Sequence, residues 1–333
     1  MSLKAPHRPV IGVTMGDAAG IGPEIVLKAL LDENLRTACR CVIIGDAVFL
    51  RKTAVNLGLY IELRDFAADE SLTGIEVFDL RNLPAEFQIG VDAAVTGKAS
   101  AEYIEAAVKL WSEKKIDAIC TAPISKMAIG LGGYNFPGHT EFLAKLTGTE
   151  EFAMSFFADK LRVVLLSTHL SLLAAIGLVK RDPLVKLIRF SEREIKKLLG
   201  RDVSIAVSGL NPHASEGGKF GSEEQAEITP AIEICQSDFG INVSGPYSPD
   251  TIFLRGFNGE FDVCIALYHD QATIPVKALS FGSGVNVTLG LPLIRTSVDH
   301  GTAFDIAGRG VAESSSLATA IRLAGELVQG SRN

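Results

Sequence analysis

Short runs of β-branched and other apolar residues alternate with longer helical patterns through most of this chain. The runs lie at residues 10–14, 41–45, 116–121, 162–167, 203–209 and 262–268. Such alternation is typical of an α/β fold with a largely parallel, twisted sheet, because parallel strands need a crossover connection, usually a helix. One helix is well delimited, since Asp182 and Pro183 suit its first positions and Gly200 its end. With 333 residues, of which 47% are hydrophobic, we expect two domains.

Composition limits the classes of function. The formal net charge of -7 argues against a nucleic-acid binder, because that role needs a dense basic face. The apolar stretch 163–179 contains Ser167, His169 and Gly177, so it predicts a strand, a turn and a helix rather than a membrane span. The opening Met1-Ser-Leu-Lys-Ala-Pro has no apolar core of a secretory signal, and we expect a cytoplasmic protein.

The cysteine pattern favours free thiols in a reducing compartment. The five cysteines are odd in number and most lie within apolar runs. Cys39 and Cys41 are the one close pair, but no neighbouring histidine or cysteine completes a metal set. Core packing is therefore the favoured interpretation of this pair.

A polar loop with several glycines at residues 295–312 precedes a helical tail and suits an adenine nucleotide. Gly301 and Gly308 let backbone approach a ligand closely, His300 offers a flat ring, and the Asp305 carboxylate can accept hydrogen bonds from ribose hydroxyls. A carboxylate also repels a 2′-phosphate, which predicts NAD rather than NADP, although Arg309 weakens the argument. A plain turn before a helix is the alternative.

Three of the six histidines, His169, His213 and His269, each follow an apolar strand pattern. Ligands of open α/β sheets bind at the carboxyl ends of strands, so these side chains can converge. Three imidazoles would hold a divalent metal and leave one position for a substrate oxygen. Their spacing carries no local ligand signature, so capping or hydrogen-bonding roles remain the alternative.

Further polar residues follow strands or occupy turns. His139 lies in a Pro-Gly turn, where it suits substrate contact; a helix start capped by Thr140 is the alternative. Lys126, Lys277 and Arg295 can each meet a phosphate or carboxylate, Arg295 in bidentate fashion. For each of these cations, a solvated surface charge is the alternative.

The loop at 295–312 has a possible partner at the other end of the chain, the glycine cluster Gly16-Asp-Ala-Ala-Gly-Ile-Gly-Pro-Glu24. Together the two segments resemble the β-decarboxylating dehydrogenases of the isocitrate and isopropylmalate group. That resemblance implies a two-domain α/β fold with the active site in the interdomain cleft. Phe304 stands where that group usually has proline, and the first turn has two extra residues.

Several motifs, in order over nearly the whole chain, resemble the 4-hydroxythreonine-4-phosphate dehydrogenase family. They are Thr121-Ala-Pro-Ile-Ser-Lys126, Gly138-His-Thr-Glu-Phe142, Ser167-Thr-His-Leu170, Gly209-Leu-Asn-Pro-His-Ala-Ser-Glu-Gly-Gly218, Tyr268-His-Asp-Gln271, Asn286-Val-Thr-Leu-Gly-Leu-Pro292 and Arg295-Thr-Ser-Val-Asp-His-Gly-Thr302. The resemblance implies a homodimer in which the histidines hold a metal, zinc, magnesium, manganese or cobalt, with the third ligand from the other subunit. It implies substrate contacts from His139, Thr140, Lys277, Asn286 and Arg295.

The same resemblance implies a terminal domain of residues 1–125 and 285–333, with the NAD loop, and a central metal, substrate and dimerisation domain of residues 126–284. The expected reaction is NAD-dependent oxidation and decarboxylation of a 4-phosphorylated 3-hydroxy acid. 4-Phosphohydroxy-L-threonine, which would give 3-amino-2-oxopropyl phosphate for pyridoxal phosphate synthesis, is the first candidate. 4-Phospho-D-threonate or D-erythronate, giving dihydroxyacetone phosphate and CO2, is the alternative.

Two features leave the assignment open. Ser171 and Lys219 depart from residues common in the biosynthetic enzymes, which puts the amino-acid substrate in doubt. The alcohol proton also needs a general base, for which Asp250, Asp270 and Lys126 are candidates. A metal-dependent phosphate-ester hydrolase or lyase could use the same histidines and cations but would not need the loop at 295–312.

Overall fold

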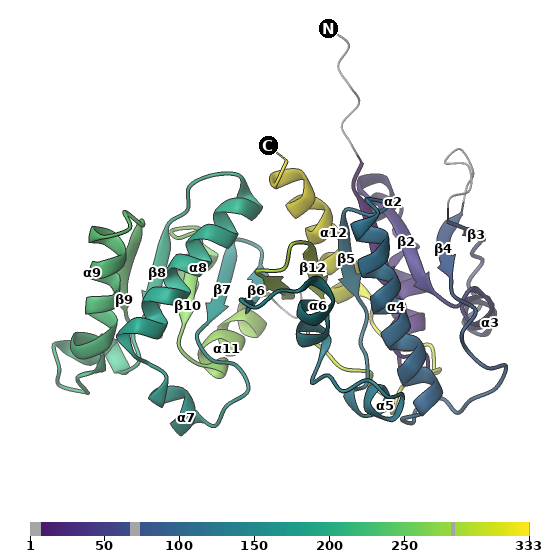
Figure 1. Ribbon diagram of the computed structural model, residues 1–333, viewed down its shortest axis with the longest axis horizontal. Coiled ribbons are helices and arrows are strands. Elements are labelled where there is room, and N and C mark those ends of the chain that lie inside the picture. The colour runs from purple at the N-terminus through teal and green to yellow at the C-terminus, as the bar shows by residue number, and fades with distance from the viewer. Residues whose placement is uncertain (1–7, 67–73, 281–283, 333) are drawn as a thin grey trace, which may run out of the picture. The chain divides into compact units, whose positions relative to one another are not determined.

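The computed structural model describes residues 8–66, 74–280 and 284–332 (Figure 1). The chain divides into two compact units, residues 1–150 with 291–329 and residues 151–290 with 330–333. Residues 126–150 thus belong to the first unit, not to the second as the sequence predicts. The reason is that α4 (Ala94–Ser112) packs closely on α5 (Lys126–Leu131). The contact is so close at Gly97 that a Cβ atom, if this residue had one, would lie 1.8 Å from the Ala128 carbonyl oxygen. The opening residues Met1 to Pro6 lie outside the described part.

The first unit contains a fully parallel sheet in the order β3-β4-β2-β1-β5-β12. Its strands are β1 (Val10–Thr14), β2 (Arg40–Gly45), β3 (Leu63–Asp65), β4 (Ile75–Asp79), β5 (Ala118–Thr121) and β12 (Ile294–Ser297). Its other helices are α1 (Gly22–Ala29), α2 (Glu33–Ala38), α3 (Ala47–Asn56), α6 (His139–Thr147) and α12 (Ser315–Gly330). β1 and β5 are almost wholly buried, which explains their continuous apolar runs.

The second unit contains a mixed sheet in the order β11-β6-β7-β10-β8-β9. Its strands are β6 (Ala153–Ala158), β7 (Leu161–Leu165), β8 (Ile205–Ser208), β9 (Val243–Tyr247), β10 (Val263–Ala266) and β11 (Val285–Leu289). β6 runs antiparallel to β11 and β7, while β7, β10, β8 and β9 are mutually parallel. The largely parallel α/β architecture that the sequence predicts is confirmed.

The helices of the second unit are α7 (Leu172–Gly177), α8 (Arg181–Leu199), α9 (Thr229–Ser237), α10 (Ile252–Phe257) and α11 (His269–Ser280), with a 3-10 turn η1 (Pro212–Glu216) and a π-turn η2 (Glu224–Ile228). α8 begins at Arg181 after Lys180, so Asp182 and Pro183 lie inside its first turn rather than at its cap and first position. Its predicted end is confirmed, because Gly200 adopts a left-handed conformation with φ 67°.

Two expectations about apolar segments are confirmed. All five cysteines are free and buried, as core packing requires. The stretch 163–179 contributes β7 and α7 and is not one long helix. Across residues 8–66, 74–280 and 284–332, no helix has both the length and the apolar composition to cross a bilayer.

Candidate active site

The three strand-end histidines lie after neighbouring strands of the second unit. His169 follows β7, His213 lies in η1 after β8, and His269 opens α11 after β10. β10 pairs in parallel with both β7 and β8, so the carboxyl ends of the three strands meet at one edge of the sheet. The prediction that these three histidines follow strands whose carboxyl ends share one edge of the sheet is therefore confirmed.

The structure brings two of these histidines together. The ring centroids of His169 and His269 are 5.9 Å apart, and His269 Nδ1 lies 2.7 Å from Asp270 Oδ1. A carboxylate beside one ring nitrogen orients the imidazole and leaves the other nitrogen for a ligand. No group of three or more metal-binding side chains gathers within the described residues. Imidazole nitrogens are suitable metal donors, but no third donor joins this pair in the part of the chain that the structure describes.

His213 stands in a strained turn. Residues 213–216 all have positive φ, from 46° at Glu216 to 65° at Ser215, although none is glycine. Left-handed backbone costs energy for such residues and often marks functional sites. The turn is held at its entrance by the Glu224 carboxylate, which accepts hydrogen bonds from the backbone N–H groups of Leu210 at 2.8 Å and Asn211 at 2.7 Å.

A cationic cluster of Arg295 and Lys126, with His139 beside them, lies in the first unit. Arg295 on β12 is 3% exposed and donates a hydrogen bond from Nη2 to Thr121 Oγ1 on β5 at 2.8 Å. Burial lowers the pKa of Arg295 to about 10, so the guanidinium remains charged at neutral pH. Burial, with the positive charges of Arg295 and Lys126, holds the pKa of His139 well below its ordinary value. His139 is therefore neutral.

This cluster has the features of an anion site. His139 is the first residue of α6, and its Nε2 atom is buried with no hydrogen-bond partner among the described residues. Lys126 opens α5, and a Cβ at Gly138 would lie 3.8 Å from Lys126 Cε and 3.3 Å from Glu141 Oε2. Gly138, not Thr140, precedes the first residue of α6, so the alternative in which Thr140 caps this helix is wrong.

The other predicted contacts lie in the second unit. Lys277 is on α11 and Asn286 on β11. Asp250 lies in the turn before α10, where its Oδ1 accepts a hydrogen bond from Ser248 Oγ at 2.5 Å. Asp270 is engaged with His269 and Lys126 with the cationic cluster, so the three candidate bases occupy three different environments.

The two glycine-rich segments do meet, as the sequence predicts. Glu24, which is 2% exposed, accepts hydrogen bonds from the N–H groups of Gly310 at 3.2 Å and Ala312 at 2.8 Å. Lys28 pairs with Glu24 at 2.7 Å and donates to the carbonyl oxygens of the same two loop residues. The late loop is thereby fixed on the N-terminal helix α1.

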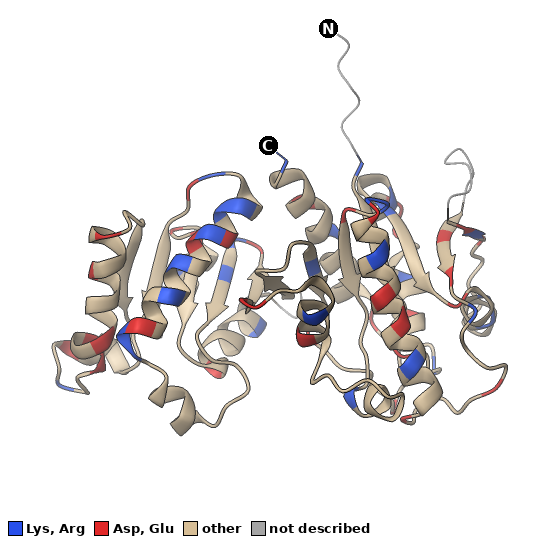
Figure 2. Ribbon diagram, in the orientation of Figure 1, with Lys and Arg blue, Asp and Glu red and all other residues tan. Residues whose placement is uncertain are grey.

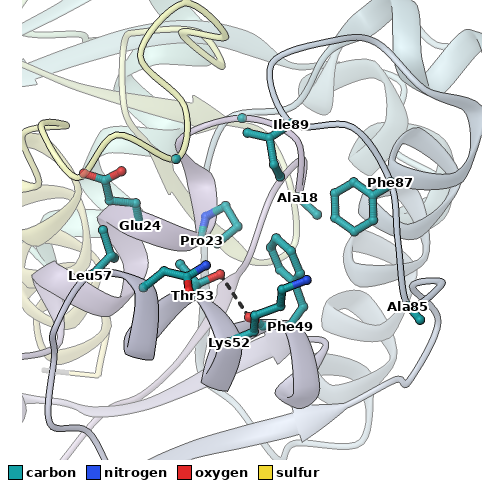
Figure 3. A pocket seen from close by; sticks show the side chains of 13 residues that line it. Ala18, Pro23, Glu24, Phe49, Lys52, Thr53, Leu57, Ala85, Phe87 and Ile89 are labelled. Atoms are coloured by element: carbon teal, nitrogen blue, oxygen red, sulfur yellow. Dashed lines mark hydrogen bonds between the residues drawn. The ribbon is translucent and has the colours of Figure 1, made fainter.

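A small cavity of about 120 Å³ opens beside this junction (Figure 3). Gly20 and Pro23 line it from the first glycine cluster and Gly308 from the late loop. Ala18 and Glu24 of the first glycine cluster also line it. The remaining wall was not predicted from the sequence and comes mainly from α3 and the segment before α4, with residues Phe49, Lys52, Thr53, Asn56, Leu57, Ala85, Phe87 and Ile89. Only the helical pattern after β2 could have pointed to α3, because these residues carry no ligand motif.

The cavity suits a flat apolar ring. The rings of Phe49 and Phe87 lie 5.0 Å apart, and Figure 3 shows both facing the cavity with Lys52 beside them. Aromatic walls with a few polar groups are typical of small-molecule sites. His300, Gly301 and Asp305 are in the same loop as Gly308, and His300 and Asp305 are exposed. The fold is that of an α/β protein, and the site residues combine imidazole, cationic and aromatic side chains.

Residues 37–324 match the family described as pyridoxal phosphate biosynthetic protein PdxA. The chain is 46% identical over 326 residues to a D-threonate 4-phosphate dehydrogenase of Cupriavidus necator, covering 96% of this chain and 98% of that protein. It is 43% identical over 331 residues to a 4-hydroxythreonine-4-phosphate dehydrogenase of Desulforapulum autotrophicum, covering 96% and 95%. A crystal structure of 4-hydroxythreonine-4-phosphate dehydrogenase from Klebsiella pneumoniae matches with a TM-score of 0.89 and 41% identity, covering 96% and 99%. The chain belongs to the PdxA family and is a dehydrogenase.

Proposed function

We propose that this protein catalyses the NAD-dependent oxidation and decarboxylation of a 4-phosphorylated 3-hydroxy acid. The observation that carries the proposal is the set of three features in one chain: paired strand-end histidines, a cationic cluster around the buried Arg295 and a cavity lined by two glycine-rich segments. A hydrolase or lyase would need the first two features but not the third.

The late loop and the cavity beside it support a nicotinamide cofactor. Gly308 with φ 75° and Gly310 with φ 74° adopt backbone that other residues rarely adopt, which allows close approach to a ligand. In our proposal the loop from His300 to Gly308 binds the adenosine half, with Asp305 accepting ribose hydroxyl hydrogen bonds. NAD supplies the hydride acceptor when bound.

The strand-end histidines support a divalent metal. His169 and His269 would contribute two imidazole nitrogens, and Asp270 would hold the His269 ring in place. A bound metal would polarise the substrate alcohol and, after oxidation, the β-keto acid. In this proposal Asp270 is a positioning residue, which leaves Asp250 and Lys126 as candidates for accepting the alcohol proton.

The cationic cluster supports recognition of the substrate's anionic end. Arg295 is rigid because it is buried and bonded to Thr121, so a phosphate or carboxylate would meet a fixed guanidinium. Neutral His139 has an Nε2 free to share a hydrogen bond with that anion without adding charge. Thr140, Lys277 and Asn286 remain proposed substrate contacts on the strength of the family resemblance.

A second copy of the chain would complete the metal site. Within the described residues of one chain, His213 stays in its strained turn and does not join His169 and His269 in a group of three metal-binding side chains. Around α7 the apolar side chains are exposed, with Leu173 at 82% and Leu172 at 59%. Exposed apolar clusters of this kind mark protein interfaces. We therefore infer a homodimer in which each His213 serves the partner's pair.

Mixing inactive variants tests this arrangement. When equal amounts of His169→Ala and His213→Ala are dissociated and reassociated together, about half of the dimers should be heterodimers. Each heterodimer has one intact site out of two, so the mixture should recover about a quarter of wild-type activity. His269→Ala with His213→Ala should behave alike, whereas His169→Ala with His269→Ala should stay inactive. Recovery in the last mixture would overturn the assignment of His213 to the partner.

The substrate experiment follows NADH formation with purified protein, NAD and a divalent metal. 4-Phosphohydroxy-L-threonine is the first candidate substrate, and its turnover would place the protein in pyridoxal phosphate synthesis. 4-Phospho-D-threonate is the second candidate. It is favoured by the 46% identity to the D-threonate 4-phosphate dehydrogenase of Cupriavidus necator, and by Ser171 and Lys219, which differ from residues common in the biosynthetic enzymes. Release of phosphate without NADH formation would instead support a hydrolase.

A further inference from the structure

A groove beside α8 shares no residue with the proposed active site. Figure 2 shows several Lys and Arg positions along the α8 ribbon, with Asp and Glu positions among them. Lys186, Arg189 and Arg193 are spaced three and four residues apart, so they share one face of the helix. They border a groove of about 410 Å³, within the range of small-molecule pockets. Its other lining residues are Glu151, Phe190, Glu192, Phe239 and Ile241.

One aromatic side chain in this groove is held by a cation. The Arg189 guanidinium lies over the Phe239 ring, 3.9 Å from its centroid, yet Phe239 remains 45% exposed. Stacking fixes the guanidinium plane and leaves its N–H edge able to donate to an anion. The groove therefore presents a fixed donor edge next to an exposed apolar ring.

The charges in the groove are unequal. Arg193 is neutralised by Glu151 at 2.8 Å and by Glu194 at 2.7 Å, and Glu192 lies 3.9 Å from Lys196. Lys186 and Arg189 form no ion pair with any described residue. The four cations Lys186, Arg189, Arg193 and Lys196 against the three carboxylates Glu151, Glu192 and Glu194 leave one net positive charge, so the groove is locally positive in a chain of net charge -7.

We propose that this groove binds a small organic anion that joins a flat ring to a phosphate group. Lys186 and Arg189 contact the phosphate, while Phe239 and Ile241 pack against the ring. A phosphate suits two converging cations, one of them a planar fork, and the ring covers an aromatic surface that otherwise faces water. Binding here is independent of turnover at the proposed active site.

Calorimetric titration with phenyl phosphate tests the proposal. The double variant Lys186→Ala/Arg189→Ala should bind at least about tenfold more weakly at this site, as expected for losing a charge-assisted hydrogen bond. Lys160→Ala/Lys197→Ala makes the same charge change at two exposed lysines outside the groove and should bind as the wild type does. Equal affinity in both double variants would overturn the proposal.

Two further titrations separate the parts of the proposal. Phe239→Leu should weaken phenyl phosphate more than inorganic phosphate, because both ligands lose the stacking that fixes Arg189 but only phenyl phosphate loses the ring contact; equal loss for both ligands, or none, would refute the ring contact. Phosphate compounds can also enter the cationic cluster of the proposed active site. His139→Gln should therefore keep the groove site, and loss of all binding in that variant would place the ligand at the active site instead.

Discussion

Replacing Glu24 tests how the two ends of the chain hold the late loop. Glu24→Ala removes the acceptor of two backbone N–H groups, those of Gly310 and Ala312, together with the ion pair to Lys28. The Ala312 N–H is buried, and leaving it without a partner costs about 1–3 kcal/mol. The more exposed Gly310 N–H and the ion pair, whose lysine is 25% exposed, add about 0.5 kcal/mol each. We expect the free energy of unfolding of the first unit to fall by about 2–4 kcal/mol.

The single tryptophan makes this change measurable. Trp111 lies on α4 in the first unit, so its fluorescence during urea unfolding reports that unit. With an m value of about 3 kcal/mol/M, the urea midpoint should drop by roughly 1 M. NAD should also bind more weakly, because the loop loses its anchor. Glu24→Gln, which keeps one acceptor oxygen, should show a smaller change.

The control is Glu33→Ala, which removes an exposed carboxylate whose distance to Arg36 is 4.0 Å. Surface pairs of this kind contribute little, so its midpoint should match the wild type. If Glu24→Ala and Glu33→Ala unfold at the same urea concentration and bind NAD equally, the anchoring argument is wrong.

Three further predictions follow from the same structure. The lowered pKa of His139 means that, below about pH 6.5, the unfolded chain binds a proton that the native chain does not, so stability falls as the pH falls. His139→Gln should flatten this acid slope in unfolding measured between about pH 7 and 5, whereas the exposed His300→Gln should keep it; parallel curves for all three proteins would contradict the assignment. Gly97→Ala should destabilise the first unit by about 3 kcal/mol, because its Cβ would meet the Ala128 backbone, whereas Gly130→Ala, with open space around it on α5, should be neutral or stabilising in the same urea titration. Asp305→Ala should raise kcat/KM with NADP relative to NAD, and an unchanged ratio would remove Asp305 from cofactor selection.

Local sequence patterns predicted much of the fold correctly. The strands β1 and β2 and the end of α8 at Gly200 follow from apolar runs and a glycine that accepts left-handed backbone. The start of α8 was misplaced, because Lys180 takes the cap position without a capping side chain. The boundary at residue 125 differs because Gly97 lets α5 pack closely on α4, which a linear pattern does not record.

The sequence by itself determined which residues end the strands and which turns contain glycine, because these depend on local backbone preference and apolar periodicity. Only the tertiary structure decided which of those turns meet. It paired His169 with His269 but left His213 in its own strained turn, and it placed Phe49 and Phe87 beside the late loop. It also set the low pKa of His139, since burial and neighbouring charge depend on residues far away in the chain.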